Sequence, residues 1–219
     1  MKNLKFTLLS FISVFAFSCT NVTDTGKVDC FYRHLVFNTG YNRLIDPFNS
    51  DIFGDDGSVD TKWQVSIGSL AQDEHGTVTY APPSSFPTAY PNTQWLLARY
   101  PFAGGGRDHV YYYTFCLSEG EYNSIDKDIS LQIRGYILDP QGGNGFMPAV
   151  QEISINNASI YNHTASTYPP SVTVSIPKRS LVYNDINVLK IELNTNARGI
   201  FQGSALNVSG YYTVLNCCD

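Results

Sequence analysis

Apolar and polar residues alternate through the centre of the chain, from Val110 to Ile160. Three strand-like runs lie there, at 110–117, 129–137 and 150–155. A period of two places alternate side chains on opposite faces of a sheet. The third run ends in Asn156-Asn157, and asparagine tolerates the left-handed conformation that a tight hairpin needs. The pattern therefore predicts antiparallel strands joined by short turns.

Shorter alternating runs occur on both sides of this stretch, at 63–67, 172–176, 189–193 and 206–214. Short strands separated by turn signals are typical of an antiparallel sandwich. The apolar phase predicts that four aliphatic residues face the space between two sheets: Leu131, Ile133, Leu189 and Ile191. Trp63 and Trp95 lie in similar runs and are predicted to be core residues. Helical periodicity is almost absent, although 178–183 can form one turn.

The first residues predict export. Lys2 and Lys5 precede an apolar segment, 6–17, that is too short to remain across a bilayer. Ala16-Phe17-Ser18 precedes Cys19, as in a bacterial lipoprotein signal whose cysteine is acylated. We therefore expect a signal peptide at 1–18, a tether and first-strand approach at 19–36, and one sandwich domain at 37–219. The expected location is the cell envelope, as an outer-membrane or surface lipoprotein, with plain secretion as the alternative.

Composition supports this reading. The chain has 15 Tyr and 13 Phe among 219 residues, enough aromatic surface to fill a two-sheet core. Charged residues make up only 15% and the formal net charge is -5, which argues against a nucleic-acid partner. Membrane attachment is expected through the lipid anchor only.

If Cys19 carries lipid, four cysteines remain, Cys30, Cys116, Cys217 and Cys218. Four cysteines in an oxidising compartment can form two disulfides, in three alternative pairings. Because the terminal strands of a closed sandwich often lie side by side, we expect Cys30 to pair with Cys217 or Cys218. No Cys-x-x-Cys spacing supports a metal or redox role.

Several short motifs occur in a fixed order: Trp63-Gln-Val65, Thr93-Gln-Trp95, Tyr113-Thr-Phe-Cys-Leu117, Ser154-Ile-Asn-Asn157 and Asn187-Val-Leu-Lys-Ile191. This order resembles galactose-binding-domain-like jelly rolls of secreted bacterial proteins, over roughly residues 38 to 215. The resemblance implies a jelly-roll sandwich that often binds carbohydrate or acts as an accessory module. It carries no catalytic motif, and a fold does not fix a function.

No catalytic constellation is visible. The histidines His34, His75, His109 and His163 are far apart. Gly203-Ser204-Ala205 lacks the Gly-x-Ser-x-Gly elbow. The acidic residues Glu119, Glu121, Asp126 and Asp128 are interpreted as a solvated connection. We therefore predict that the chain is not an enzyme.

No cofactor is expected, except that Asp51, Asp55 and Asp56 can supply oxygen ligands for a structural calcium ion. The Asp-x-Asp-x-Asp-Gly spacing is missing, so a turn-rich loop with Asx caps is the alternative.

Sugar recognition needs aromatic faces for stacking and polar groups for the hydroxyls. Three predicted loops, 81–92, 104–109 and 161–170, bring such residues together. The candidate ligand-binding residues are Tyr90, Arg107, Asp108, Tyr161, Asn162 and Tyr168. The expected ligand is a carbohydrate or glycoconjugate, with a protein partner bound through a sheet edge or loops as the alternative. A further alternative is that the tyrosines only cover the ends of the sandwich.

Overall fold

The computed structural model describes residues 30–40, 59–67, 70–79, 87–99, 109–139, 145–194 and 203–217. The signal peptide at 1–18, Cys19, the calcium candidates Asp51, Asp55 and Asp56, and Arg107, Asp108 and Cys218 lie outside these ranges. No helix within the described ranges is both long and apolar enough to cross a membrane.

The described chain is almost entirely β-structure. The strands are β1 (Cys30–Val36), β2 (Val59–Ile67), β3 (Leu70–Thr79), β4 (Trp95–Arg99), β5 (His109–Cys116), β6 (Ile129–Asp139), β7 (Gly145–Pro148), β8 (Val150–Ile155), β9 (Ala158–Asn162), β10 (Val172–Ile176), β11 (Ile186–Leu193) and β12 (Gly203–Cys217). The helices are α1 (Glu119–Ser124) and the 3₁₀ turn η1 (Lys178–Ser180). The turn η1 confirms the single turn predicted at 178–183.

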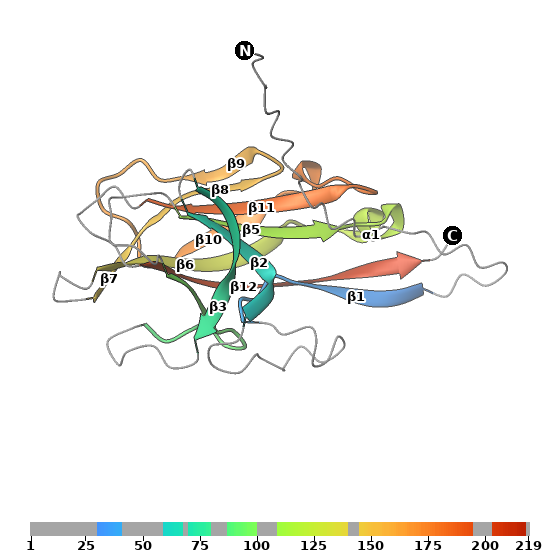
Figure 1. Ribbon diagram of the computed structural model, residues 1–219. Helices are drawn as coiled ribbons and strands as arrows, with labels where there is room; N and C mark the ends of the chain where they lie inside the picture. Colours follow the sequence, from blue (N-terminus) through green and yellow to red (C-terminus); the bar gives the residue numbers. More distant parts are fainter. Residues whose placement is uncertain are drawn as a thin grey trace, which may run out of the picture.

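A continuous antiparallel sheet folds over into two layers, and Figure 1 shows them stacked. The hydrogen-bonded order is β10-β6-β12-β4-β3-β2-β5-β11-β8-β9, with β1 on β12 and β7 on β6. Strands β10, β6, β12 and β4 form one layer, and β5, β11, β8 and β9 belong to the other (Figure 1). From β5 onward the chain crosses repeatedly between the layers, as in jelly-roll sandwiches. The predicted all-β antiparallel sandwich is confirmed.

The core lies between the layers and follows the predicted alternation. Leu131, Ile133, Leu189 and Ile191 are each 0% exposed, so the predicted inward phase is confirmed. Trp63 and Trp95 are also buried, as predicted. The layers approach closely at Gly135, where an added Cβ would lie 2.4 Å from Leu193 Cδ2 and 2.8 Å from Val150 Cγ2. A side chain at position 135 would therefore clash with the opposite layer.

The Asn156-Asn157 turn joins β8 and β9 as predicted, with φ values of 50° and 65°. The Asn156 side chain also fixes the turn against β11 and η1: its Oδ1 accepts from Val188 N on β11 at 2.8 Å and its Nδ2 donates to Ser180 O on η1 at 2.9 Å. A residue that tolerates positive φ therefore also anchors the hairpin.

The first strand, β1, occupies 30–36, within the segment 19–36 expected to hold the tether and the approach to the first strand, and it pairs with the last strand, β12. The interpretation of the acidic connection 119–128 as a solvated loop is wrong at Glu121. This residue belongs to α1 and is 3% exposed, whereas Glu119, Asp126 and Asp128 are exposed.

Glu121 is buried because two interactions hold its carboxylate. Ser118 caps α1, accepting from Glu121 N at 3.2 Å, while Glu121 Oε2 accepts from Ser118 N at 2.9 Å. This is a capping box. The same carboxylate meets the Arg33 guanidinium on β1, with Nε–Oε1 at 2.6 Å and Nη2–Oε2 at 2.7 Å. A bidentate ion pair therefore joins the first strand to the helix.

The last seven residues of β12 leave β6 and β4 and pair with β1 as a two-stranded ribbon, from Tyr211↔Val36 to Cys217↔Cys30. The ribbon projects to the right in Figure 1, beside the C-terminus. The sulfur of Cys30 is in a disulfide bond. Its register partner is Cys217, and whether Cys217 or Cys218 supplies the second sulfur stays a prediction.

Candidate functional site

A shallow pocket of about 420 Å³ opens beside β6. Its lining residues come from three separate segments: Pro87, Thr88, Arg134, Tyr136, Pro170 and Ser171. Arg134 and Tyr136 belong to the phase of β6 opposite to Ile133 and Ile137, so they lie on the outer face of the layer. The volume falls within the range of about 300–1,000 Å³ that is usual for small-molecule sites.

Arg134 is the charged group of this site, which we call the Arg134 pocket. Its guanidinium carbon lies 4.1 Å from the centre of the Tyr90 ring, a cation–π contact. Its Nη1 donates to the carbonyl of Thr88. Neither ion pair of the described residues includes Arg134. The guanidinium is thus fixed in direction while its charge has no carboxylate partner in the described part of the chain.

The wall that carries Tyr90 is held by Asn207, a buried residue on the outer phase of β12. Asn207 Oδ1 accepts from Tyr90 N at 2.9 Å, and its Nδ2 donates to Thr93 Oγ1 at 2.8 Å and to Gln94 O at 3.0 Å. Trp95 Nε1 donates to Pro87 O at 3.0 Å. Because 87–94 is bound at several points, this wall is preformed.

Tyr136, which lines the pocket, also belongs to a small buried apolar cluster. Tyr136 packs edge-on against Trp95 and against Phe146, with ring centres 5.5 Å apart in both cases. Ala205 completes the cluster. The Tyr136 hydroxyl donates to Pro170 O at 3.1 Å, and burial raises the pKa of this phenol. Tyr136 therefore supplies the apolar floor and ties 170–171 to it.

The aromatic residues after β8 form a second group, the His163 stack, made of Tyr161, His163 and Tyr168. The His163 ring lies 6.5 Å from Tyr161 and 4.3 Å from Tyr168. The Tyr168 hydroxyl donates to Gln151 Oε1 and accepts from Asn194 Nδ2 at 2.7 Å. Tyr161 packs on the main core, and burial raises the pKa of its phenol. Both tyrosines therefore have structural partners on rings and hydroxyls.

The candidate residues chosen from the sequence are thus divided. Tyr90 lies at the Arg134 pocket, and Tyr161 and Tyr168 meet at the His163 stack. Tyr161 and Asn162 were predicted in a loop, which is wrong, since both belong to β9. Whether Tyr161, Asn162 and Tyr168 bind a ligand stays a prediction. Arg134 was missed because an arginine in the outward phase of a strand has no sequence signal for a pocket that distant segments complete.

Sequence distance also concealed a histidine–serine contact. His109 is the first residue of β5 rather than part of a loop, and its Nδ1 lies 2.6 Å from Ser204 Oγ. Tyr111 OH lies 2.6 Å from the same oxygen. All three residues are buried, and burial lowers the pKa of His109 to about 4. The hydrogen bonds of a neutral imidazole and two hydroxyls satisfy these polar groups within the core. The Ser204 and Tyr111 hydroxyl oxygens are buried and therefore not accessible to a substrate.

Asp60 is a buried carboxylate with a structural explanation. It accepts from the backbone N–H of Gly40 at 2.7 Å, of Lys62 at 2.8 Å and of Trp63 at 3.3 Å. Burial raises the pKa of Asp60, against these hydrogen bonds. Within the described ranges, no three His, Cys, Asp or Glu side chains cluster as metal ligands. The calcium prediction at Asp51, Asp55 and Asp56 falls outside those ranges and remains untested.

Comparison with known proteins gives little further guidance. No protein family model matches the chain. No curated protein matches it either. Among solved structures it is similar to one titled "Crystal structure of putative beta-galactosidase from bacteroides fragilis", with a TM-score of 0.38 and 14% identity. The match covers 81% of this chain and 23% of that chain, and no functional argument is based on it.

Proposed function

We propose that this chain is a non-catalytic binding module for carbohydrate or glycoconjugate and that the ligand binds in the Arg134 pocket. The observation that supports the proposal is a preformed concave site lined by two prolines and Tyr136, in which the Tyr90 ring and the Thr88 carbonyl hold the guanidinium of Arg134. Sugar C–H faces can pack on such walls, while hydroxyl groups bond to the guanidinium, Thr88 and Ser171.

The proposal includes the expected location at the cell envelope. Acylation of Cys19 would place many copies on one surface, and avidity would then compensate for weak binding by a single domain. Replacing Cys19 with Ala should release the protein from washed membranes into the soluble fraction. Recovery of wild-type protein without a diacylglyceryl mass would contradict the anchor.

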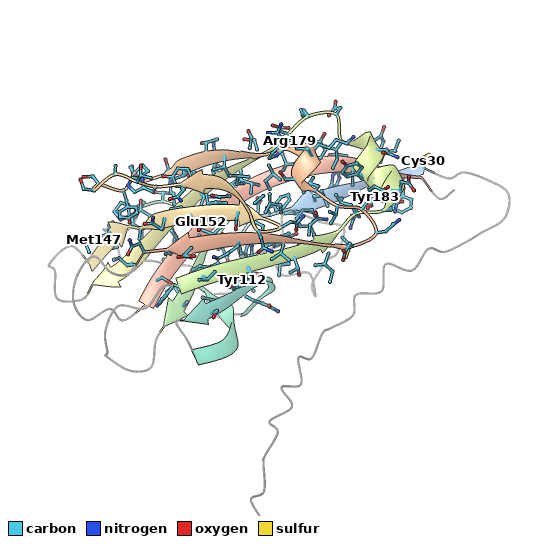
Figure 2. All side chains as sticks on the ribbon, turned by 90° about the horizontal axis from the view of Figure 1, so that it is seen from above. Cys30, Tyr112, Met147, Glu152, Arg179 and Tyr183 are labelled. Carbon is cyan, nitrogen blue, oxygen red and sulfur yellow. The ribbon has the colours of Figure 1, made fainter. Side chains whose placement is uncertain are left out.

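A glycan array tests the binding proposal. Folded protein multimerised on a scaffold should give signals for a related set of glycans. Tyr90→Ala should weaken binding roughly fivefold, because it removes a cation–π contact of about 1 kcal/mol that holds the Arg134 guanidinium in position. Tyr183→Ala is a matched control, since Tyr183 is 46% exposed and lies at the opposite end of the molecule from Met147 on β7 (Figure 2).

The array has an outcome that contradicts the proposal. If folded, multivalent wild-type protein gives no signal on a broad array, the chain does not act as a carbohydrate-binding module. Equal weakening by Tyr90→Ala and Tyr183→Ala would instead show that the Arg134 pocket is not where the glycan binds.

One observation favours a second candidate function, binding of another envelope protein through a sheet edge. Among the described residues β1 pairs only with β12, so its other edge has no strand partner. The ribbon also exposes large side chains, with Phe31 at 50%, Tyr32 at 74% and Tyr211 at 53%. An exposed edge with aromatic residues is the feature that strand addition uses. Cross-linking through a photoreactive residue at Tyr32, in intact cells, would distinguish this function from sugar binding.

A further inference from the structure

The Arg134 pocket has an electrostatic property that narrows its ligand. Of its six lining residues only Arg134 carries a charge. Among the described residues, the groups that hold the guanidinium are neutral: the Tyr90 ring and the Thr88 carbonyl. Aromatic rings and carbonyl groups orient a cation without neutralising it, so the described lining of the pocket carries a net positive charge.

Arg134 is half-buried, and its guanidinium has donors beyond the Nη1 group that Thr88 binds. A guanidinium presents paired N–H groups in a planar fork that matches the two oxygens of a carboxylate. A neutral hydroxyl can accept only part of that fork. The ligand that satisfies this pocket best therefore brings its own carboxylate.

We infer that the Arg134 pocket binds the carboxylate of an acidic sugar, such as a uronic acid residue, and that Arg134 selects such sugars over neutral ones. The inference rests on the proposed carbohydrate-binding function and defines its ligand class. Tyr136 and the two prolines supply the surface against which the sugar ring packs, Tyr90 orients the guanidinium, and Arg134 supplies the counter-charge. A sulfated sugar offers the same charge and can also meet the fork with two oxygens, so a sulfated ligand is compared directly with the carboxylate.

Matched pairs of ligands test the charge directly. Three acidic sugars are titrated beside neutral partners: trigalacturonate beside its methyl ester, sialyllactose beside lactose, and methyl glucuronide beside methyl glucoside. For at least one pair, wild-type protein should bind the acid about tenfold or more tightly, as a charge-assisted hydrogen bond predicts. The preference should shrink as sodium chloride is raised, because salt screens the charge.

Substitutions of Arg134 separate selection from folding. Arg134→Gln should reduce the acid-over-neutral affinity ratio to about twofold or less, while both ligands lose the hydrogen bonds of the guanidinium, and Arg134→Lys should retain part of the ratio. Arg179→Gln is the control, since Arg179 is exposed on η1 and lies near Tyr183, away from Met147 (Figure 2). Unchanged far-ultraviolet circular dichroism and unfolding temperature confirm that each variant folds.

The outcomes are distinct. Equal affinity within every acid–neutral pair, with binding retained, overturns the carboxylate inference and leaves the carbohydrate function standing. An acid preference that survives Arg134→Gln also overturns it. Tighter binding of a sulfated trisaccharide than of trigalacturonate would reassign the anion, and tighter binding of an acidic peptide would reassign the ligand to protein. If none of these ligands binds and the glycan array also gives no signal, the proposed function is overturned as well.

Discussion

The Arg134 pocket and the β1–β12 ribbon are both rich in aromatic residues, yet they use them in opposite ways. In the pocket, Tyr136 is 3% exposed and its hydroxyl is bound, so the ring forms a floor. On the ribbon, Tyr32 is 74% exposed. The pocket is concave and positively charged, whereas the ribbon is a sheet edge. Aromatic content alone therefore does not show where a ligand binds.

The difference follows from what lies across each surface. At the pocket, β6 has neighbours on both sides, and Thr88 and Tyr90 contact its outer face at Arg134. In the ribbon, β12 no longer pairs with β6 or β4. Its inward-facing side chains, Tyr212 and Val214, pack against the main core. The outer phase carries a hydrogen-bonded group in which Tyr211 OH lies 2.7 Å from His34 Nδ1. This outer group therefore stays in solvent.

The core beneath both surfaces gives the largest predicted effect. Leu189→Ala should lower the free energy of unfolding by about 2–5 kcal/mol, because the side chain is 0% exposed and its removal leaves a cavity. Chemical denaturation monitored by tryptophan fluorescence measures the loss, and the pocket and ribbon should unfold in one transition. A loss below about 1 kcal/mol would contradict the assigned packing.

The disulfide tests the ribbon alone. Cys30→Ser should lower the free energy of unfolding by about 2–4 kcal/mol, since the bridge restricts the unfolded chain. A reducing agent should destabilise wild-type protein by a similar amount and leave Cys30→Ser unchanged, while glycan binding by the folded variant stays intact. Non-reducing peptide mapping should join Cys30 to Cys217 or Cys218. Rapid alkylation of Cys30 in native wild-type protein would disprove the bridge.

The pH dependence of stability tests the part of the core next to the pocket. His109 contacts Ser204 in that part of the core, and the neighbouring residue Ala205 belongs to the apolar cluster of Trp95 and Tyr136. The pKa of His109 is about 4 in the folded protein, against an ordinary value of 6.5. Between these values the unfolded chain takes up a proton that the folded one refuses, so stability falls as pH drops from 6.5 to 4. The loss from this group is at most about 3 kcal/mol.

Replacement of this histidine isolates its contribution to the pH dependence. His109→Gln should flatten the curve of unfolding free energy over that interval. An unchanged slope in His109→Gln would contradict a buried, neutral His109.

The smallest expected change in stability is at Tyr32. Because its side chain is largely exposed, Tyr32→Ala should change the free energy of unfolding by less than about 0.5 kcal/mol. Glycan binding should be unchanged, while any envelope partner captured through the edge strand should be lost. Loss of glycan binding in Tyr32→Ala, with the fold intact, would move the sugar site to the ribbon.

Alternation predicted the core well, because each inward residue, such as Leu131 or Leu189, is specified by its own strand. The start of β1 could not be read in the same way, since Cys30 to His34 are mostly exposed and show no period. The helix α1 did have a readable signal, the Ser118-x-x-Glu121 capping box, which the interpretation as a solvated loop overlooked.

The site was harder to predict for a physical reason. Tyr90 could be proposed from its loop, but the pocket exists only because segments 87–88 and 170–171 meet over β6. The first of these segments is held by Asn207, more than a hundred residues after Tyr90, and the second by Tyr136. Tyr161 and Tyr168 looked equally suitable, and their contacts with His163 arise from tertiary packing.

The central claim is that ligand binds at the Arg134 pocket and not on the ribbon. The most direct measurement is a chemical-shift perturbation map of ¹⁵N-labelled protein titrated with the strongest glycan from the array. We predict the largest shifts at the amides of Thr88, Arg134 and Ser171, with little change at Tyr32, His34 and Thr213. Shifts concentrated on the ribbon residues, with those three pocket amides unmoved, would contradict the account.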